Sequence, residues 1–344
     1  MEIFRKNTVA SIAAIGMVAA GIGAASEVSA QTIWNHNVFG GKRALTVGLE
    51  VMKEELEKAG GGDFELKLHY ASALGPPKQI PENIKIGAVE SGMNCAGYYP
   101  NKFPLLTVME LPFLAPADTR QSALVQKEIM EHPLIVAELK DRWNAKYFSP
   151  NFLPPYEFMG NKRIETTADM KGVKMRISGL NATALEVFGA VPTMVTAPEG
   201  YTALDRGTID SFGFPYTYAF GAYKLYEVSK YTTEGLALSG FMCFNSVNLD
   251  TWNATPEKVR NALPAAHDLA TEGMIQAYAE ADKKWRPVFS ERLEIVAIDP
   301  KVRAELAKGA NKIWEQWVAD QEAEGRPGRE MLDFAKATVA KHSK

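Results

Sequence analysis

Residues 161–179 read NKRIETTADMKGVKMRISG, and the end of this stretch predicts the class of the fold. Apolar and basic side chains alternate over Val173–Ile177, as they do in a strand with one buried face. The pair Ser178–Gly179 supplies a loop, and residues 181–188 are expected to continue as a helix. A strand, a loop and a helix in this order form the repeating unit of an α/β sheet, which is the fold class that we predict.

The same order of elements recurs towards the N-terminus. Thr32–Val38 is a strand candidate, Leu45–Leu56 carries apolar residues at helical spacing, and Phe64–Tyr70 alternates like a half-buried strand. Further strands are expected at residues 91–96, 209–214 and 241–249, and further helices at residues 81–86, 118–143 with a break at Pro133, 304–323 and 329–342. Residues 256 to about 290 predict one helix of about 50 Å, long enough to touch two domains.

Length and composition describe an ordinary globular protein. The chain has 344 residues, which at roughly 150 residues per domain suggests two domains. Hydrophobic residues make up 46% and charged residues 23%, so disorder and coiled coil are excluded as the main state. The formal charge is −3, and without a clustered basic surface we do not expect nucleic-acid binding.

The N-terminus has the pattern of a secretory signal peptide. Arg5 and Lys6 precede an apolar stretch over residues 9–25, and small side chains at positions 28–30 suit a signal peptidase. We expect cleavage after Ala30 and place the mature protein in the periplasm. An uncleaved membrane anchor is the alternative, but Gly and Ala residues weaken the apolar stretch near its end. No other apolar stretch approaches the roughly 20 residues needed to cross a bilayer.

The two cysteines, Cys95 and Cys243, lie far apart in the sequence. An oxidising compartment would allow them to form a disulfide. The sequence alone does not show whether their Cα atoms lie close enough for a disulfide. Buried free thiols are therefore the favoured interpretation, and pairing is the alternative.

The sequence lacks the common catalytic motifs. It contains no Gly-x-Ser-x-Gly, no phosphate-binding loop, no Gly-x-Gly-x-x-Gly after a strand and no His-Glu-x-x-His. The five histidines are scattered singly, which gives no metal-binding spacing. We therefore predict neither an enzyme nor a protein with a metal or other cofactor.

Arg176 stands out because of its place near the end of a predicted strand. In open α/β sheets, ligands bind outside the carboxyl ends of the strands. The first turn of the helix that follows also offers unpaired N–H groups to an anion. A guanidinium there can hold a carboxylate through two parallel hydrogen bonds. The alternative is an exposed arginine paired with a surface acid.

Aromatic residues occupy every second position from Phe212 to Phe220. A strand whose aromatic face joins the core is one interpretation. Pro215 and the phenol groups within this run favour the wall of a cleft instead. Such a wall would suit a ligand with an apolar or aromatic body.

Several motifs in one order give the chain a family resemblance. Besides residues 161–179, they are GAVPTMVTAPEGYTALDRGTIDSFGFP at 189–215, YKLYEVSKYTT at 223–233, FPLLTVMELPFL at 103–114 and SALGPPKQIPENIKIGAVESG at 72–92. With these motifs the chain resembles the extracytoplasmic solute receptors of tripartite ATP-independent periplasmic (TRAP) transporters, over essentially the whole mature sequence.

The resemblance implies a type II-like periplasmic binding protein with two discontinuous lobes, joined by hinge strands and a long helix that spans both. Lobe I would comprise residues 31–153 with 242–282, and lobe II residues 154–241 with 283–344. The lobes would close on an organic acid and deliver it to a permease with a small and a large integral membrane subunit. A receptor that presents its ligand to a sensor and a secreted α/β enzyme are the alternatives.

The resemblance also assigns site residues. The substrate-binding arginine of the family falls on Arg176, which would pair with the ligand carboxylate. Phe214 stands where many sialic-acid and sugar-acid receptors have Asn before Pro, and Tyr156 stands twenty positions before Arg176, where those receptors have a second arginine. Buried sugar hydroxyls would therefore lack partners, at about 1 to 3 kcal/mol each. A small or aromatic monocarboxylate is favoured.

Further ligand contacts are expected from both lobes. Asn37, Asn94 and Tyr98 are the candidates in lobe I, and Tyr218 is the candidate from the aromatic run. Sulfonates and short hydroxy or keto acids stay open beside aromatic acids.

Overall fold

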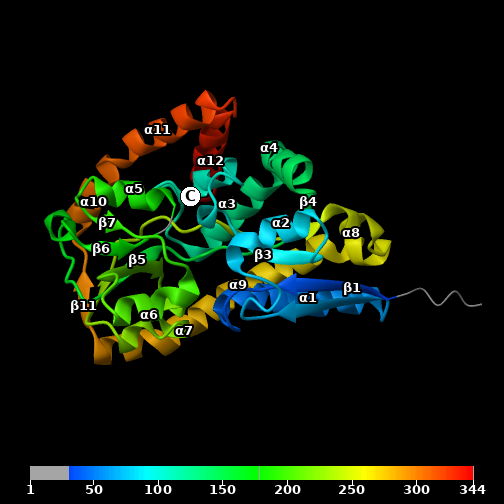
Figure 1. Cartoon of the computed structure of the whole chain (residues 1–344), viewed down its shortest axis with the longest axis horizontal. Helices are drawn as coiled ribbons and strands as arrows, with labels where there is room; N and C mark the ends of the chain where they lie inside the picture. Colours follow the sequence, from blue (N-terminus) through cyan, green and yellow to red (C-terminus); the bar gives the residue numbers. More distant parts are fainter. Residues whose placement is uncertain (1–30, 178, 344) are drawn as a thin grey trace, which may run out of the picture. The chain divides into compact units, whose positions relative to one another are not determined.

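The strands of the chain pair into two separate sheets, and helices cover both (Figure 1). The computed structural model describes residues 31–177 and 179–343. The predicted leader and its cleavage after Ala30 lie outside the described residues. Within the described part of the chain, no helix is long and apolar enough to cross a membrane.

The first sheet has the strand order β2-β1-β3-β10-β4. Its strands are β1 (Thr32–Asn37), β2 (Phe64–His69), β3 (Ser91–Cys95), β4 (Ala145–Ser149) and β10 (Cys243–Asn248). β1 runs parallel to β2 and β3, whereas β10 runs antiparallel to β3 and β4. The chain therefore leaves this sheet after β4 and returns to it much later with β10.

The second sheet has the strand order β11-β9-β5-β8-β6-β7. Its strands are β5 (Tyr156–Gly160), β6 (Lys174–Arg176), β7 (Val191–Pro192), β8 (Ser211–Pro215), β9 (Tyr231–Glu234) and β11 (Glu294–Ala297). β6 runs parallel to its neighbours β7 and β8, and its last residue, Arg176, lies opposite Phe212 near the start of β8. The predicted α/β class is confirmed.

Helix α9 links the two sheets. It runs over Glu257–Arg292, contacts helix α1 (Val47–Gly60) and β4 on the first side, and contacts helix α7 (Tyr218–Ala222) and β11 on the second (Figure 1). At about 1.5 Å per residue its 36 residues span about 54 Å. The predicted long helix that reaches both halves is confirmed.

The remaining helices flank the sheets. They are α2 (Ile80–Lys85), α3 (Thr119–Glu131), α4 (Pro133–Ala137), α5 (Leu180–Glu186), α6 (Gly200–Asp205), α8 (Leu249–Ala254), α10 (Pro300–Lys308), α11 (Ala310–Ala323) and α12 (Gly328–His342). α12 packs on α3, so the end of the chain returns to the first sheet's side.

Two expectations about these elements are wrong. The single helix expected over residues 304–323 is two helices, α10 and α11, which meet at Gly309; glycine is a poor helix former. The alternating aromatic run does not continue as one strand, because β8 ends at Pro215 and α7 begins at Tyr218. Proline has no N–H for the ladder, which favours the end of the strand at that point.

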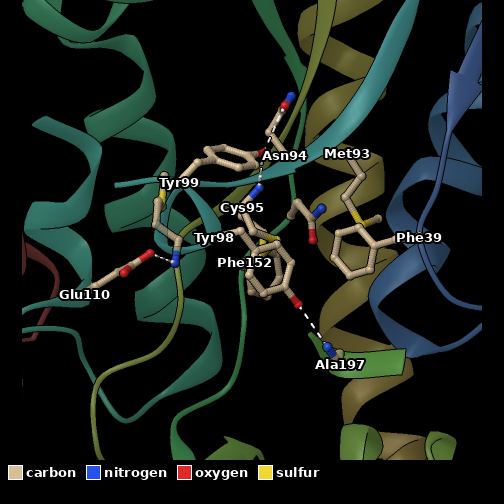
Figure 2. The surroundings of a disulfide bond; sticks show 12 residues. Phe39, Met93, Asn94, Cys95, Tyr98, Tyr99, Glu110, Phe152 and Ala197 are labelled. Atoms are coloured by element: carbon tan, nitrogen blue, oxygen red, sulfur yellow. Dashed lines mark hydrogen bonds between the residues drawn. A yellow bond between two sulfur atoms is a disulfide. The ribbon is translucent and has the colours of Figure 1, made fainter. Parts of the chain in front are cut away.

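Cys95 and Cys243 form a disulfide, so the favoured expectation of free thiols is wrong (Figure 2). The two residues are direct partners in the antiparallel pairing of β3 with β10, and their Cα atoms lie 4.0 Å apart. The late return of β10 to the first sheet creates this proximity, and the distance between the cysteines in sequence gives no sign of it.

Candidate ligand-binding site

Arg176 is the last residue of β6, and its side chain is completely buried. Nε donates a hydrogen bond to the carbonyl of Val195 at 2.8 Å, and Nη1 donates to the carbonyl of Gly213 at 3.1 Å. The guanidinium carbon lies 4.5 Å from the ring centre of Phe212 and 5.2 Å from that of Phe214. Two carbonyls and two aromatic faces thus fix the orientation of the guanidinium.

The second terminal nitrogen of Arg176 has no hydrogen-bond partner among the residues that the structure describes. Nη2 is buried without a hydrogen bond, and none of the described ion pairs includes this side chain. A buried charged group without a counterion is costly, by several kcal/mol in general. The site is therefore ready to receive an acceptor, and a carboxylate matches the fork of a guanidinium best.

A cavity of about 20 Å³ lies between the elements of the two sheets. Half of its lining residues are aromatic, and they include Tyr98, Tyr156, Phe214 and Tyr218, four of the residues predicted from the sequence. The full set is Phe39, Arg43, Leu45, Cys95, Tyr98, Leu153, Tyr156, Ala197, Phe214, Pro215, Tyr218, Tyr223, Phe241 and Cys243. Arg176 adjoins this cavity through its contact with Phe214. The volume suits about one water molecule, so a ligand needs the walls to separate.

Tyr98 connects the two sides of the cavity. It belongs to the helical turn that follows β3, and its hydroxyl oxygen accepts a hydrogen bond at 3.3 Å from the backbone N–H of Ala197, which follows β7 (Figure 2). Its ring packs edge-on against Phe241, 4.9 Å between centres. Burial raises the pKa of Tyr98, and the charges of Arg176 and Arg43 oppose that rise. The phenol is therefore neutral at physiological pH.

Tyr156 and Tyr218 also contribute neutral phenols. Tyr156 begins β5 and packs edge-on against Phe214, with 6.3 Å between ring centres. Burial raises the pKa of Tyr156 well above its usual value, against the opposing charge of Arg176. Burial likewise raises the pKa of Tyr218, the first residue of α7. These groups can donate hydrogen bonds to a ligand without adding negative charge.

Asn37 and Asn94 do not line the cavity. The amide nitrogen of Asn37 donates to the carbonyl of Gly75 at 2.9 Å. The amide nitrogen of Asn94 donates to the hydroxyl of Ser246 at 2.9 Å, and its oxygen accepts from the hydroxyl of Tyr99 at 3.2 Å (Figure 2). In this arrangement the structure places both asparagines in the supporting network of the first sheet, apart from the four aromatic residues and Arg176.

Arg43 is a wall residue that the sequence reasoning missed. Only 9% of it is exposed, and Nη1 donates to the carbonyls of Phe39 at 2.9 Å and Gly41 at 2.7 Å. Its guanidinium carbon lies 5.3 Å from the ring centre of Phe39 and 5.8 Å from that of Tyr223. The sequence signal that could have drawn attention to it is a basic residue just after two glycines, Gly40 and Gly41.

Glu110 is a second residue that the sequence reasoning missed. Its carboxyl group is fully buried and accepts a hydrogen bond from the backbone N–H of Met242 at 3.1 Å (Figure 2). The other oxygen has no partner and lies against the backbone of Gly179, just beyond Arg176. Burial raises the pKa of Glu110 to about 8, although the N–H groups of Met242 and Gly97 oppose this. The carboxyl group is mostly protonated at pH 7.

The electrostatic character of the cavity is positive. No acidic residue is among the described residues that line it, whereas Arg43 does line it and Arg176 adjoins it. Across residues 31–177 and 179–343, no group of three or more His, Cys, Asp or Glu side chains is placed to hold a metal ion. The arrangement can bind an anion with an aromatic or apolar body.

Comparison with known proteins gives one family. A sequence model of DctP, the bacterial extracellular solute-binding protein family 7, matches residues 36–321. That range contains both arginines and every aromatic residue of the cavity walls.

Individual relatives are more distant. A solute-binding protein of Verminephrobacter eiseniae is 28% identical over 193 residues, which are 54% of this chain and 56% of that protein. The monocarboxylate 2-oxoacid-binding periplasmic protein of a Nostoc species is 26% identical over 237 residues, which are 67% of this chain and 64% of that protein. The chain therefore matches somewhat less than two thirds of the length of each.

Solved structures cover nearly all of the fold. A TRAP solute-binding protein from Rhodoferax ferrireducens, in complex with copurified benzoate, has a TM-score of 0.80 and 25% identity and covers 90% of this chain and 98% of its own. A TRAP periplasmic solute-binding protein from Bordetella bronchiseptica, with bound mandelate, has a TM-score of 0.78 and 21% identity and covers 90% and 99%. The predicted two-lobe binding-protein fold is confirmed.

Proposed function

Because the chain belongs to family 7 of the bacterial extracellular solute-binding proteins, we propose that it is the receptor of a TRAP transporter and that it binds an organic acid between its two sheets. The receptor would act without chemical turnover, because its task is to hold and deliver the acid unchanged. We assign the ligand carboxylate to Arg176.

One observation carries this assignment. Arg176 is buried at the carboxyl end of β6 with Nη2 unpartnered, while Nε and Nη1 are anchored to backbone carbonyls. A carboxylate placed at Nη2 completes the hydrogen bonding and neutralises the charge. Hydrogen bonds to charged groups contribute about 1.5 to 3 kcal/mol each, and a fixed donor loses little entropy on binding.

The cavity walls favour a small aromatic monocarboxylate. Phe214, Tyr156 and Tyr218 offer ring faces and edges, and aromatic pairs prefer such geometries at centre distances of about 4.5 to 7 Å. The Rhodoferax ferrireducens relative, which carries benzoate, supports an aromatic body. The Nostoc relative is named for 2-oxoacids, which supports a carboxylate and keeps short oxo acids within the range to test.

The closure mechanism follows from the division of the chain. We assign residues 31–153 with 242–282 to one lobe and residues 154–241 with 283–344 to the other, with the last helix, α12, reaching back to pack on α3 of the first lobe. A ligand that contacts both lobes stabilises the closed arrangement because those contacts exist only there. The hydrogen bond from Ala197 to Tyr98 joins the two lobes in the same way.

The receptor works with partners in the membrane. We propose that it is exported through a leader cut after Ala30, acts in the periplasm, and docks its closed form on a permease with one small and one large integral membrane subunit. The closed receptor encloses the charged ligand until the receptor docks on the permease.

A ligand screen tests this function. Aromatic and short-chain organic acids are added to the purified protein, and the melting temperature is recorded. A ligand at about 100 times its dissociation constant stabilises the folded state by about 2.7 kcal/mol, which gives a clear shift. Calorimetry then gives the dissociation constant, which we expect to rise at least about 100-fold in Arg176→Met because a charged, bidentate contact is lost.

The matched control is Arg163→Met. Arg163 precedes β6 and is exposed, and it pairs with Glu165 and Glu294 at the surface. This variant changes the net charge equally and should leave the dissociation constant within about twofold. Absence of a shift with every acid, or equal affinity in the wild type and Arg176→Met, overturns the proposal.

A further inference from the structure

Arg43 has the features of a second recognition group. It lies after β1 on the first sheet's side of the cavity, whereas Arg176 lies on the second sheet's side. Nη1 is satisfied by two backbone carbonyls, but the partner of Nη2 is only the sulfur of Met93 at 3.9 Å. A thioether is a weak acceptor. One end of this guanidinium is therefore anchored while the other keeps donor capacity.

The two guanidinium groups act on the same phenol. The charges of Arg176 and Arg43 both oppose the rise of the pKa of Tyr98 that burial causes. The charge of Arg43 likewise opposes the rise of the pKa of Tyr218, and the charge of Arg176 opposes the rise of the pKa of Tyr156. The cavity walls that carry these three tyrosines therefore lie within the field of two cations that come from opposite sides.

Nearby acidic side chains do little to neutralise the positive field of Arg43 and Arg176. The carboxylate of Glu50 accepts hydrogen bonds from Thr46 and Tyr70 and pairs with Lys42, which faces solvent. Glu110, behind the cavity, is mostly protonated at pH 7 because burial raises its pKa to about 8. No acidic side chain belongs to the described cavity lining. A ligand with a single carboxylate supplies the acceptor that Nη2 of Arg176 lacks. Nη2 of Arg43 then keeps only its contact with the sulfur of Met93.

We propose that Arg43 selects for a second oxygen acceptor on the ligand, so that the preferred ligand is an aromatic acid carrying a hydroxyl, oxo or second carboxylate group away from the carboxylate held by Arg176. This inference rests on the proposed organic-acid receptor and extends its favoured ligand from a plain aromatic monocarboxylate to aromatic acids with such a second acceptor. The anchored Nη1 holds the guanidinium in place before the ligand arrives, which favours a directional contact through Nη2.

The test compares a matched set of acids by titration calorimetry. Benzoate has one acceptor group, and its 3-hydroxy, 4-hydroxy, 3-carboxy and 4-carboxy derivatives add a second one in two directions. We expect the wild type to bind at least one derivative about tenfold more tightly than benzoate, as one charge-assisted hydrogen bond allows. In Arg43→Met this preference should fall below about threefold, because the derivative loses more affinity than benzoate does.

Two further variants separate recognition from structure. Lys42→Met removes the same charge from the neighbouring exposed position and should keep the preference. Arg43→Lys keeps the charge without the fork and should restore the preference only in part. An equal loss of affinity for benzoate and its derivatives in Arg43→Met shows a purely structural role and overturns the inference, as does a wild type without any preference. Failure of all five acids to bind the wild type contradicts the proposed aromatic-acid ligand as well.

Discussion

Two buried carboxyl groups, Glu157 and Glu110, differ in how many hydrogen bonds they accept. Glu157 accepts four hydrogen bonds within the second sheet's side, from the hydroxyl of Thr233 and from the backbone N–H groups of Gly235, Leu236 and Ala237. Glu110 accepts one from Met242 and leaves an oxygen without a partner.

The difference reflects what each region does. Both oxygens of Glu157 face donors, and the hydroxyl of Thr233 that donates to it also accepts from the N–H of Phe158. Such a site suits a carboxylate and fixes the loop after β9. Glu110 lies against Gly179, where segments of the two sides meet, and it has a raised pKa. Burial raises the pKa of both carboxyl groups, and the donors around each one oppose that rise; Glu157 has four of them and is the better hydrogen-bonded group.

The largest effect is expected from Glu157→Ala. The substitution leaves three backbone N–H groups and a hydroxyl without their acceptor in a buried loop. We expect the free energy of unfolding to fall by about 4 kcal/mol, measured by urea denaturation. Glu54→Ala, at an exposed helix position, is the control and should change it by less than about 0.5 kcal/mol. A loss below about 1 kcal/mol for Glu157→Ala would show that the loop does not depend on this carboxylate.

The second effect concerns the covalent link beside Glu110. The disulfide joins β3 to β10, and Met242, the partner of Glu110, directly precedes Cys243. Replacing both cysteines by serine should lower the free energy of unfolding by about 3 kcal/mol, because the unfolded chain loses a long-range constraint. Chemical denaturation in the oxidised and reduced states measures it. Identical midpoints for the wild type with and without reductant would contradict this expectation.

The third effect is a pH dependence. The pKa of Glu110 is raised to about 8 in the folded protein, from 4.5, so the folded state binds more protons than the unfolded state between these values. Its contribution is complete below about pH 4.5 and is lost as the pH rises through about 8. Between pH 6 and pH 8, the wild type should therefore lose about 2 kcal/mol more stability than Glu110→Gln. Parallel stability curves for the two proteins would refute the assignment.

The smallest effect is expected from Tyr98→Phe. The hydroxyl of Tyr98 accepts one hydrogen bond from Ala197 across the cavity, at 3.3 Å. Its loss should weaken ligand binding about fivefold, since one neutral hydrogen bond contributes about 1 kcal/mol. Calorimetry with the best ligand from the screen measures the change. Tyr99→Phe, which alters a phenol bonded within the first sheet's side, provides the comparison.

The fold could be predicted where one periodicity extended over a whole element. The alternation over residues 64–69 and the apolar spacing over 47–60 each report one buried face, and β2 and α1 form there. Alternation failed at residues 216–220, because a spacing of two also occurs by chance across a turn and a short helix. Long-range pairing, such as that of Cys95 with Cys243, depends on sheet order, which local pattern does not encode.

The candidate site could be predicted in part for the same reason. Arg176 was accessible to sequence reasoning because strand ends gather at one edge of a sheet. Arg43 belongs to an irregular loop after β1, and its placement depends on hydrogen bonds to Phe39 and Gly41 that no periodicity reveals. Asn94 was expected as a ligand contact from the family resemblance, but it lies on a strand whose residues are all buried and its amide donates to Ser246.

The small volume of the cavity sets the kinetics of exchange. A space of about 20 Å³ is too small for an organic acid, so an acid can enter or leave only when the walls separate. Escape then becomes a first-order step whose rate constant cannot exceed that of wall separation, however weak the contacts within. Acids of quite different affinity would share this upper limit on the escape rate constant. The residence time of the most weakly bound acid would then report how often the unloaded protein opens.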